Sequence, residues 1–108
     1  MKIPSIQMSH LQRYVHMTIE GDVGECAGWN MKSGKLIIKG DAGDYLGDSM
    51  DNGTIEVFGN AGENIGYMGT GGKIIVHGDI KNVHDAVFND TKIYHGKNLI
   101  WAKGGFVK

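Results

Sequence analysis

The chain has 108 residues, enough for one domain with a modest core. Its 11 Lys and Arg residues nearly balance its 12 Asp and Glu residues, so the composition predicts no basic surface for nucleic acid or an anionic membrane. No apolar run approaches the roughly 20 residues of a membrane span, and the first residues lack a secretory pattern. A lone cysteine, Cys26, excludes an internal disulfide and favours a reducing, cytoplasmic location.

The unusual quantity is glycine, with 18 residues against a single proline. Three sets of four glycines are related by shifts of nineteen residues, and a fourth set starts at Gly78 before the pattern decays. A fixed period of this kind predicts a repeat architecture in which the glycines are structural. The repeat glycines are Gly21, Gly24, Gly28, Gly34, Gly40, Gly43, Gly47, Gly53, Gly59, Gly62, Gly66 and Gly72.

In chain order, residues 1–16 precede the repeat and are predicted to form an N-terminal cap. Short aliphatic runs then recur at 17–20, 36–38, 55–57 and 74–76. Runs of this length, rich in β-branched residues and bounded by glycine, are typical of strands, and no ten-residue helical periodicity is present. One strand per nineteen residues predicts stacked coils over residues 17–95, with each strand parallel to the next at about 4.8 Å.

Positions nineteen residues apart should stack into columns. The glycine columns fit corners with positive φ or places where neighbouring backbones approach closely. The Asp or Asn after the first glycine of each copy is typical of an outward, solvated turn. That outward column is Asp22, Asp41, Asn60 and Asp79. The expected interior columns are Val23, Ala42, Ala61 and Ile80; Ala27, Leu46 and Ile65; Met31, Met50 and Phe88; and Leu36, Ile55 and Ile74 with Ile38, Val57 and Val76.

Residues 96–108 complete the single domain of residues 1–108 but lie outside the repeat. They carry Leu99, Ile100, Trp101, Phe106 and Val107. A solenoid exposes core and strand edges at its ends, so this apolar segment is predicted to be a C-terminal cap or contact segment. Trp101 and Phe106 are the candidate contact residues, and a homo-oligomer is expected.

The glycine pattern resembles the GXXGXXXG repeat of the GXGXG family. The clearest copy is Gly40-Asp41-Ala42-Gly43-Asp44-Tyr45-Leu46-Gly47, followed by Gly53 and the strand 55–57. That family includes the carboxyl-terminal domain of the large chain of glutamate synthase and the glycine-repeat component of formylmethanofuran dehydrogenase. The resemblance implies an all-β fold, a right-handed single-stranded parallel β-helix with a repeat of about 19 residues. It also implies a structural role, because flavin, iron–sulfur, molybdenum or tungsten chemistry belongs to other domains and no family catalytic residue maps onto this chain.

Two patterns suggest chemistry of the chain's own. Ser49 follows Gly47 and Asp48, which resembles the Gly-Asp-Ser opening of a lipase and esterase superfamily, but no Gly-x-Ser-x-Gly elbow is present. His77 and His95 could stack on adjacent coils as two metal ligands, whereas structural zinc usually takes four and catalytic zinc three. A small esterase-like hydrolase and a metal-binding protein therefore remain the alternatives.

Other patterns are weaker. The acidic columns lack the nonapeptides of calcium-binding solenoids, and residues 69–73 lack the first P-loop glycine and precede a strand. An exposed apolar face is the functional alternative to packing at coil corners for Trp29, Tyr67, Met68 and Trp101.

The sequence thus predicts a cytoplasmic, non-catalytic structural or assembly module that binds other protein subunits or domains. The resemblance implies an oxidoreductase complex of the glutamate synthase or formylmethanofuran dehydrogenase type. No catalytic, cofactor-binding or metal-binding residue is assigned, no cofactor is expected, and neither nucleic acid nor a membrane is an expected partner.

Overall fold

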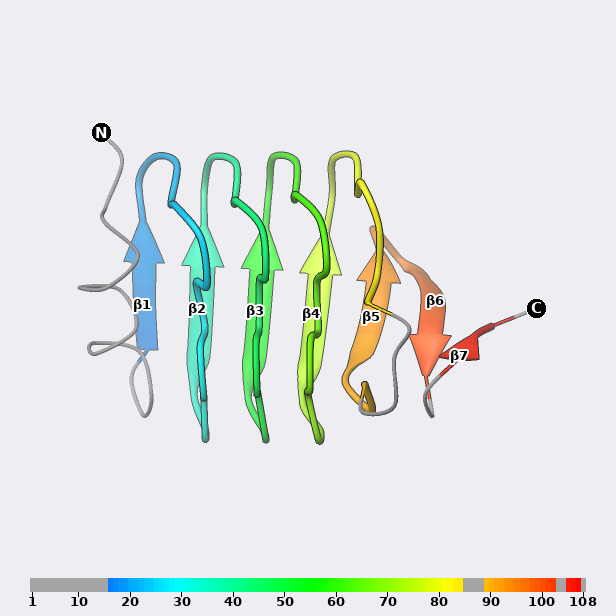
Figure 1. Cartoon of the computed structure of the whole chain (residues 1–108). Helices are drawn as coiled ribbons and strands as arrows, with labels where there is room; N and C mark the ends of the chain where they lie inside the picture. The colour runs from blue at the N-terminus through cyan, green and yellow to red at the C-terminus, as the bar shows by residue number, and fades with distance from the viewer. Residues whose placement is uncertain (1–15, 85–88, 103–104, 108) are drawn as a thin grey trace.

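The computed structural model describes residues 16–84, 89–102 and 105–107, and every regular element in these ranges is a β-strand. The strands lie side by side in chain order within one sheet (Figure 1). They are β1 (His16–Ile19), β2 (Lys35–Ile38), β3 (Thr54–Val57), β4 (Lys73–Val76), β5 (Lys92–His95), β6 (Asn98–Ala102) and β7 (Gly105–Phe106). The predicted N-terminal cap, apart from His16, and Phe88 lie outside the described residues.

The parallel strands β1 to β5 keep one register throughout. Lys35 of β2 pairs with Thr54 of β3, and Thr54 pairs with Lys73 of β4. Partners are nineteen residues apart, so each coil of the chain advances by one strand. The predicted all-β parallel β-helix is confirmed. None of the described residues forms a helix with the length and apolarity needed to cross a membrane.

The interior consists of the predicted apolar columns. Along each strand, alternate side chains point inward, so Leu36 and Ile38 of β2 are buried while Lys35 is exposed. Ile80 is only partly buried, because no further coil stacks on its connecting segment. The fully buried members that form the centre of the stack are Met31, Leu36, Ile38, Leu46, Met50, Ile55, Val57, Ile65, Ile74, Val76 and Ile93.

The connecting segment between strands repeats two corners in the left-handed region. Non-glycine residues adopt this conformation in both corners, as Tyr45 does at φ 60° and Ser49 at φ 59°. The conformation lets their N–H groups bond to the next coil, with 2.8 Å from Tyr45 N to Glu63 O and 2.8 Å from Ser49 N to Tyr67 O. Inter-coil hydrogen bonding therefore offsets a backbone cost of about 1–2 kcal/mol per residue.

The parallel stack ends at a hairpin. Gly96 has φ 61°, and the chain reverses there so that β6 pairs antiparallel with β5 and β7 antiparallel with β6. Trp101 of β6 is only 1% exposed, and its Nε1–H donates to the Asn89 carbonyl at 2.8 Å. The described part of residues 96–108 therefore covers the last parallel strand and adds Trp101 to the core.

Candidate functional site

A ladder of side-chain oxygens joins the coils along one edge. Asp22 Oδ1 accepts a hydrogen bond from Asp41 N–H at 2.7 Å, and Asp41 Oδ1 accepts one from Asn60 N–H at 2.8 Å. Asn60 Oδ1 accepts the next from Asp79 N–H at 2.8 Å. The sequence predicts this column as solvated turns, and its members also hold each coil on the preceding one. Sequence reasoning missed this second role.

The same ladder explains why glycine precedes each Asp or Asn. A Cβ on Gly59 would lie 2.7 Å from the Gly40 carbonyl oxygen and would also collide with Asp41 Oδ1. Gly43 and Gly62 likewise face the backbone of the coil before them. Both predicted reasons for glycine therefore occur: close approach at these positions, positive φ at Gly47, and both together at Gly53, where a Cβ would lie 3.0 Å from Gly34 O.

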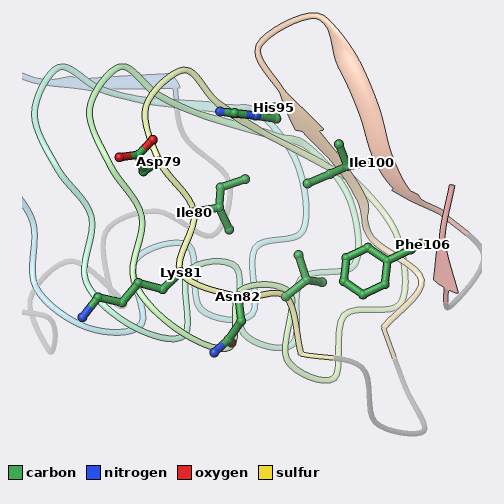
Figure 2. Close-up of a pocket in the computed structure, with 8 residues that line it drawn as sticks. Asp79, Ile80, Lys81, Asn82, His95, Ile100 and Phe106 are labelled. Carbon is green, nitrogen blue, oxygen red and sulfur yellow. The ribbon is translucent and has the colours of Figure 1, made fainter. Parts of the chain in front are cut away.

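The ladder stops at Asp79, because no later coil places a backbone N–H against its carboxylate among the described residues. Downstream of residues 79–83 the space that another connecting segment would fill is a groove of about 440 Å3, here called the C-terminal groove. Figure 2 shows Ile80, Ile100 and Phe106 around this space, with Lys81 and Asn82 pointing away from it. The groove is lined by Asp79, Ile80, Val83, His95, Ile100 and Phe106, together with Lys81 and Asn82. It is an apolar surface beside an open backbone edge.

Three polar groups on this edge have counterparts that are hydrogen-bonded in the earlier coils. These edge groups are the Asp79 carboxylate, the Ile80 N–H and the Lys81 carbonyl, and within the described ranges none of them has a hydrogen-bond partner. One coil earlier, Ala61 N–H donates to Asp79 O at 2.8 Å. An unpaired edge of this kind favours addition of another chain.

The two predicted contact residues occupy different depths. Phe106 is 62% exposed at the mouth of the groove, and its ring packs edge-on against Trp101 with centroids 4.7 Å apart. Trp101 is buried, so it reaches a partner only by supporting Phe106. Of the predicted apolar face, Trp29 and Met68 are exposed, and Tyr67 is half-buried with its ring edge-on to those of Tyr45 and His84.

The residues predicted for hydrolysis form a different arrangement from a catalytic triad. Ser49 Oγ donates to Asp48 Oδ1 at 2.8 Å, so its proton goes to a neighbouring carboxylate. Partial burial raises the pKa of Asp48, and the Ser49 hydrogen bond and His84 act against that rise. A triad instead places a histidine between the serine and the acid.

The thiol of Cys26 is the second candidate nucleophile in the coils. Burial raises the pKa of the Cys26 thiol, and the charges of Asp48 and Glu25 raise it further. The thiolate is the nucleophilic form of cysteine. The thiol is therefore protonated at neutral pH.

The strand register separates the two histidines that could have formed a metal pair. His95 is the partner of Val76, whereas His77 is the next residue along and alternates to the opposite face. His77 Nε2 instead contacts Glu56 Oε2 at 2.8 Å, and its ring packs on Phe58. In the described ranges, no three His, Cys, Asp or Glu side chains gather where they could hold a metal ion.

The glycine-rich run at residues 69–73 leads into β4. Lys73 N–H donates to Gly53 O at 3.0 Å, and Thr70 Oγ1 donates to the Asp51 carboxylate. These groups serve contacts between coils. No protein-family model matches the chain, and neither the curated proteins nor the solved structures contain a match to it.

Proposed function

We propose that this chain is a non-catalytic assembly module that binds other protein subunits or domains through the C-terminal end of its β-helix. The observation that carries the proposal is the edge of Asp79, Ile80 and Lys81 beside exposed Phe106. A partner that hydrogen-bonds to this edge and covers the apolar groove gains both directional contacts and buried apolar area.

The state of the reactive side chains supports a non-catalytic role. Ser49 donates its hydroxyl proton to Asp48, and Cys26 has a raised thiol pKa. A serine nucleophile needs a base positioned by a third group, and a cysteine nucleophile needs a lowered pKa. Neither residue is therefore prepared for covalent catalysis.

The proposal extends to the setting of the module. The glycine repeat resembles those of glutamate synthase and formylmethanofuran dehydrogenase, which favours an oxidoreductase complex as the partner. The lone Cys26 favours the cytoplasm. Exposed Phe106 and Val107 also favour self-association when the partner is absent.

Affinity purification from the native organism and sedimentation equilibrium of the purified chain test this function. We expect a stoichiometric partner or a micromolar homo-oligomer, and Phe106→Glu should weaken either association at least tenfold. Phe58→Glu is the matched control, because Phe58 is 45% exposed but follows β3 on the sheet side of the molecule.

A parent chain that purifies alone and stays monomeric at high micromolar concentration would contradict the assembly role. Equal weakening by both glutamate substitutions would contradict the C-terminal end as its location. Ester hydrolysis that Ser49→Ala abolishes would instead support the alternative of a small hydrolase.

A further inference from the structure

As an extension of the proposed assembly role, we infer that the C-terminal groove binds an extended segment of a partner protein with the pattern glycine, polar residue, apolar residue, glycine. The segment takes the place of the connecting segment that a further coil would supply. The molecule itself contains the template for this interaction, because each coil already binds such a segment from the next.

Besides the bond from Gly40 N–H to Gly21 O at 3.1 Å, the template has three hydrogen bonds between neighbouring coils. Asp41 N–H donates to Asp22 Oδ1 at 2.7 Å, and the carbonyl of the same residue accepts from Val23 N–H at 2.9 Å. Two residues later, Gly43 N–H donates to Gly24 O at 3.3 Å. The following coil repeats all three bonds from Asn60 and Gly62. The interaction is thus a property of the repeat.

The fourth coil carries counterparts of these three groups in residues that line the groove. By register, Asp79 is the counterpart of Asp22 and Asp41, and the Ile80 N–H is the counterpart of the Val23 N–H. The Lys81 carbonyl follows the Gly24 carbonyl in the same count, but the backbone shifts here, because Lys81 N–H donates to Ala61 O whereas Gly62 N–H donates to Gly43 O. An incoming polar residue donates its N–H to Asp79 and accepts from Ile80 through its carbonyl. The residue two positions later donates to Lys81. Main-chain bonds of this type provide affinity in strand addition.

Specificity for glycine follows from the close approach of the backbones. A Cβ on Gly62 would lie 2.9 Å from the Gly43 carbonyl carbon, and one on Gly59 would lie 2.7 Å from Gly40 O. Equivalent positions of the incoming segment meet the same obstruction from Lys81 and Asp79. The residue between the polar residue and the second glycine should be apolar, because it faces inward as Ala61 does above Ile80.

Apolar side chains extend the site beyond the backbone. In the template, Leu46 follows Ala42 by four residues and is fully buried in the interior column of Ile65. Val83 bridges to Ile65 and continues that column at the groove. A leucine at the same spacing in the incoming segment would therefore pack on Val83, beside Ile100 and Phe106.

The hairpin favours a partner segment over a second copy of this chain. A further coil would need to place its strand on the free edge of β5, but β6 already pairs there through Tyr94 with Leu99 and Ile93 with Trp101. The connecting-segment side remains open while the strand side is closed. A short extended segment fits this geometry, whereas a whole β-helix stacked end to end does not.

A peptide with the sequence of residues 40–46, acetylated and amidated, is the probe for calorimetric titration with the full chain. The control peptide carries Gly40→Ala and Gly43→Ala. We expect the parent peptide to bind and the control to bind at least tenfold more weakly, because its two methyl groups meet the backbone. Resonances of the Ile80 amide should shift on binding, whereas that of Val23, which is already bonded within the stack, should not.

Variants of the protein test the side-chain acceptor. Asp79→Ala should weaken peptide binding by about tenfold, the usual effect of losing one hydrogen bond to a charged group. Asp79→Asn should bind within about threefold of the parent, since Asn60 already performs this role one coil earlier. Glu63→Ala, at an exposed acid in a different column, is the control for net charge.

Equal binding of the two peptides, no binding of either, or an unchanged affinity in Asp79→Ala would overturn this inference. If the peptide fails to bind while Phe106→Glu still disrupts assembly, the groove assignment is wrong and the assembly role stands. If the peptide binds as expected but the chain neither self-associates nor purifies with a partner, the groove assignment stands and the assembly role is wrong.

Discussion

The regular coils and the C-terminal hairpin use glycine for different purposes. In the coils, Gly40, Gly59 and Gly78 have no room for a side chain because the preceding coil lies against them. In the hairpin, a Cβ on Gly96 or Gly105 would meet nothing within 4 Å. A high glycine content therefore does not identify structural glycines by itself. The nineteen-residue spacing distinguishes the two groups.

The largest effect is expected where the two regions join. Trp101→Ala should lower the free energy of unfolding by about 4 kcal/mol, because it empties a buried site and removes the donor to Asn89 O. Phe106→Ala should cost less than about 1 kcal/mol, since most of its ring is exposed. Urea denaturation measures both. Similar costs for the two variants would show that the hairpin does not contribute to the coil core.

A pair of glycine substitutions tests the contrast directly. Gly59→Ala should destabilise the chain by about 3 kcal/mol, because its Cβ would overlap Gly40 and Asp41 in the coil before it. Gly105→Ala should change stability by less than about 0.5 kcal/mol, because its Cβ has open space and its φ is not positive. Thermal melts of the two variants give the comparison. A Gly59→Ala melt like that of the parent would contradict the close approach.

The ladder of side-chain oxygens predicts a smaller difference in stability, between substitutions in its middle and at its end. Asp41→Ala removes the acceptor for Asn60 N–H and should cost about 1 kcal/mol, whereas Asp41→Asn should retain most of the stability. Asp79→Ala removes no hydrogen bond among the described residues, so its effect should be close to zero. Chemical denaturation at pH 7 distinguishes them. A cost at Asp79 equal to that at Asp41 would indicate that its carboxylate already has a partner in solution.

The smallest effect concerns pH and lies within the coils. Burial raises the pKa of Asp48, so the folded chain holds that proton more tightly than the unfolded chain does. Its contribution to stability is greatest below the ordinary aspartate value of about 4 and declines as the pH rises through the raised pKa. The stability of the parent relative to Asp48→Asn should therefore fall between acidic and neutral pH.

Asp51 provides the matched control of opposite sign. Hydrogen bonds from Lys32 and Thr70 lower the pKa of Asp51, so its contribution is present at neutral pH and is lost as the pH falls through the lowered value. The stability of the parent relative to Asp51→Asn should fall on acidification. Parallel trends for the two variants would contradict the pKa directions.

The length of one coil and the buried residues could be predicted from the sequence. Residues of the same type recur every nineteen positions, and this spacing determines which residues stack. Leu36, Ile55 and Ile74 fall in one register in both the pattern and the structure. The antiparallel hairpin could not be predicted from the sequence, because residues 96–108 do not continue the repeat. An apolar segment of this kind is compatible with caps of several topologies. The two-residue reversal at Gly96 and Lys97, between strand-like runs, was the available signal for it.

The C-terminal groove was beyond sequence reasoning for a different reason. Its edge groups belong to residues that look like ordinary members of the repeat, and they become unpaired only because β5 is followed by a reversal. The acceptor role of Asp41 was hidden as well, since Gly-Asp is also typical of an isolated turn. A glycine stands eighteen residues after Asp22, Asp41 and Asn60, and this spacing was the signal that the Asp or Asn oxygen occupies the place a glycine Cβ would take.

The Asp side-chain oxygen of one coil contacts a glycine Cα of the next coil. Because this contact recurs from coil to coil, a whole coil can be duplicated without disturbing it. A tandem duplication of residues 40–58 would bring its own Gly40, its own Asp41 and a strand of the right phase, so every new rung would match the rungs on either side. A duplication of eighteen or twenty residues would set a carboxylate against a side chain and turn inward residues outward. The length of such a protein can therefore change during evolution in steps of one coil, while the residues at its two ends stay the same.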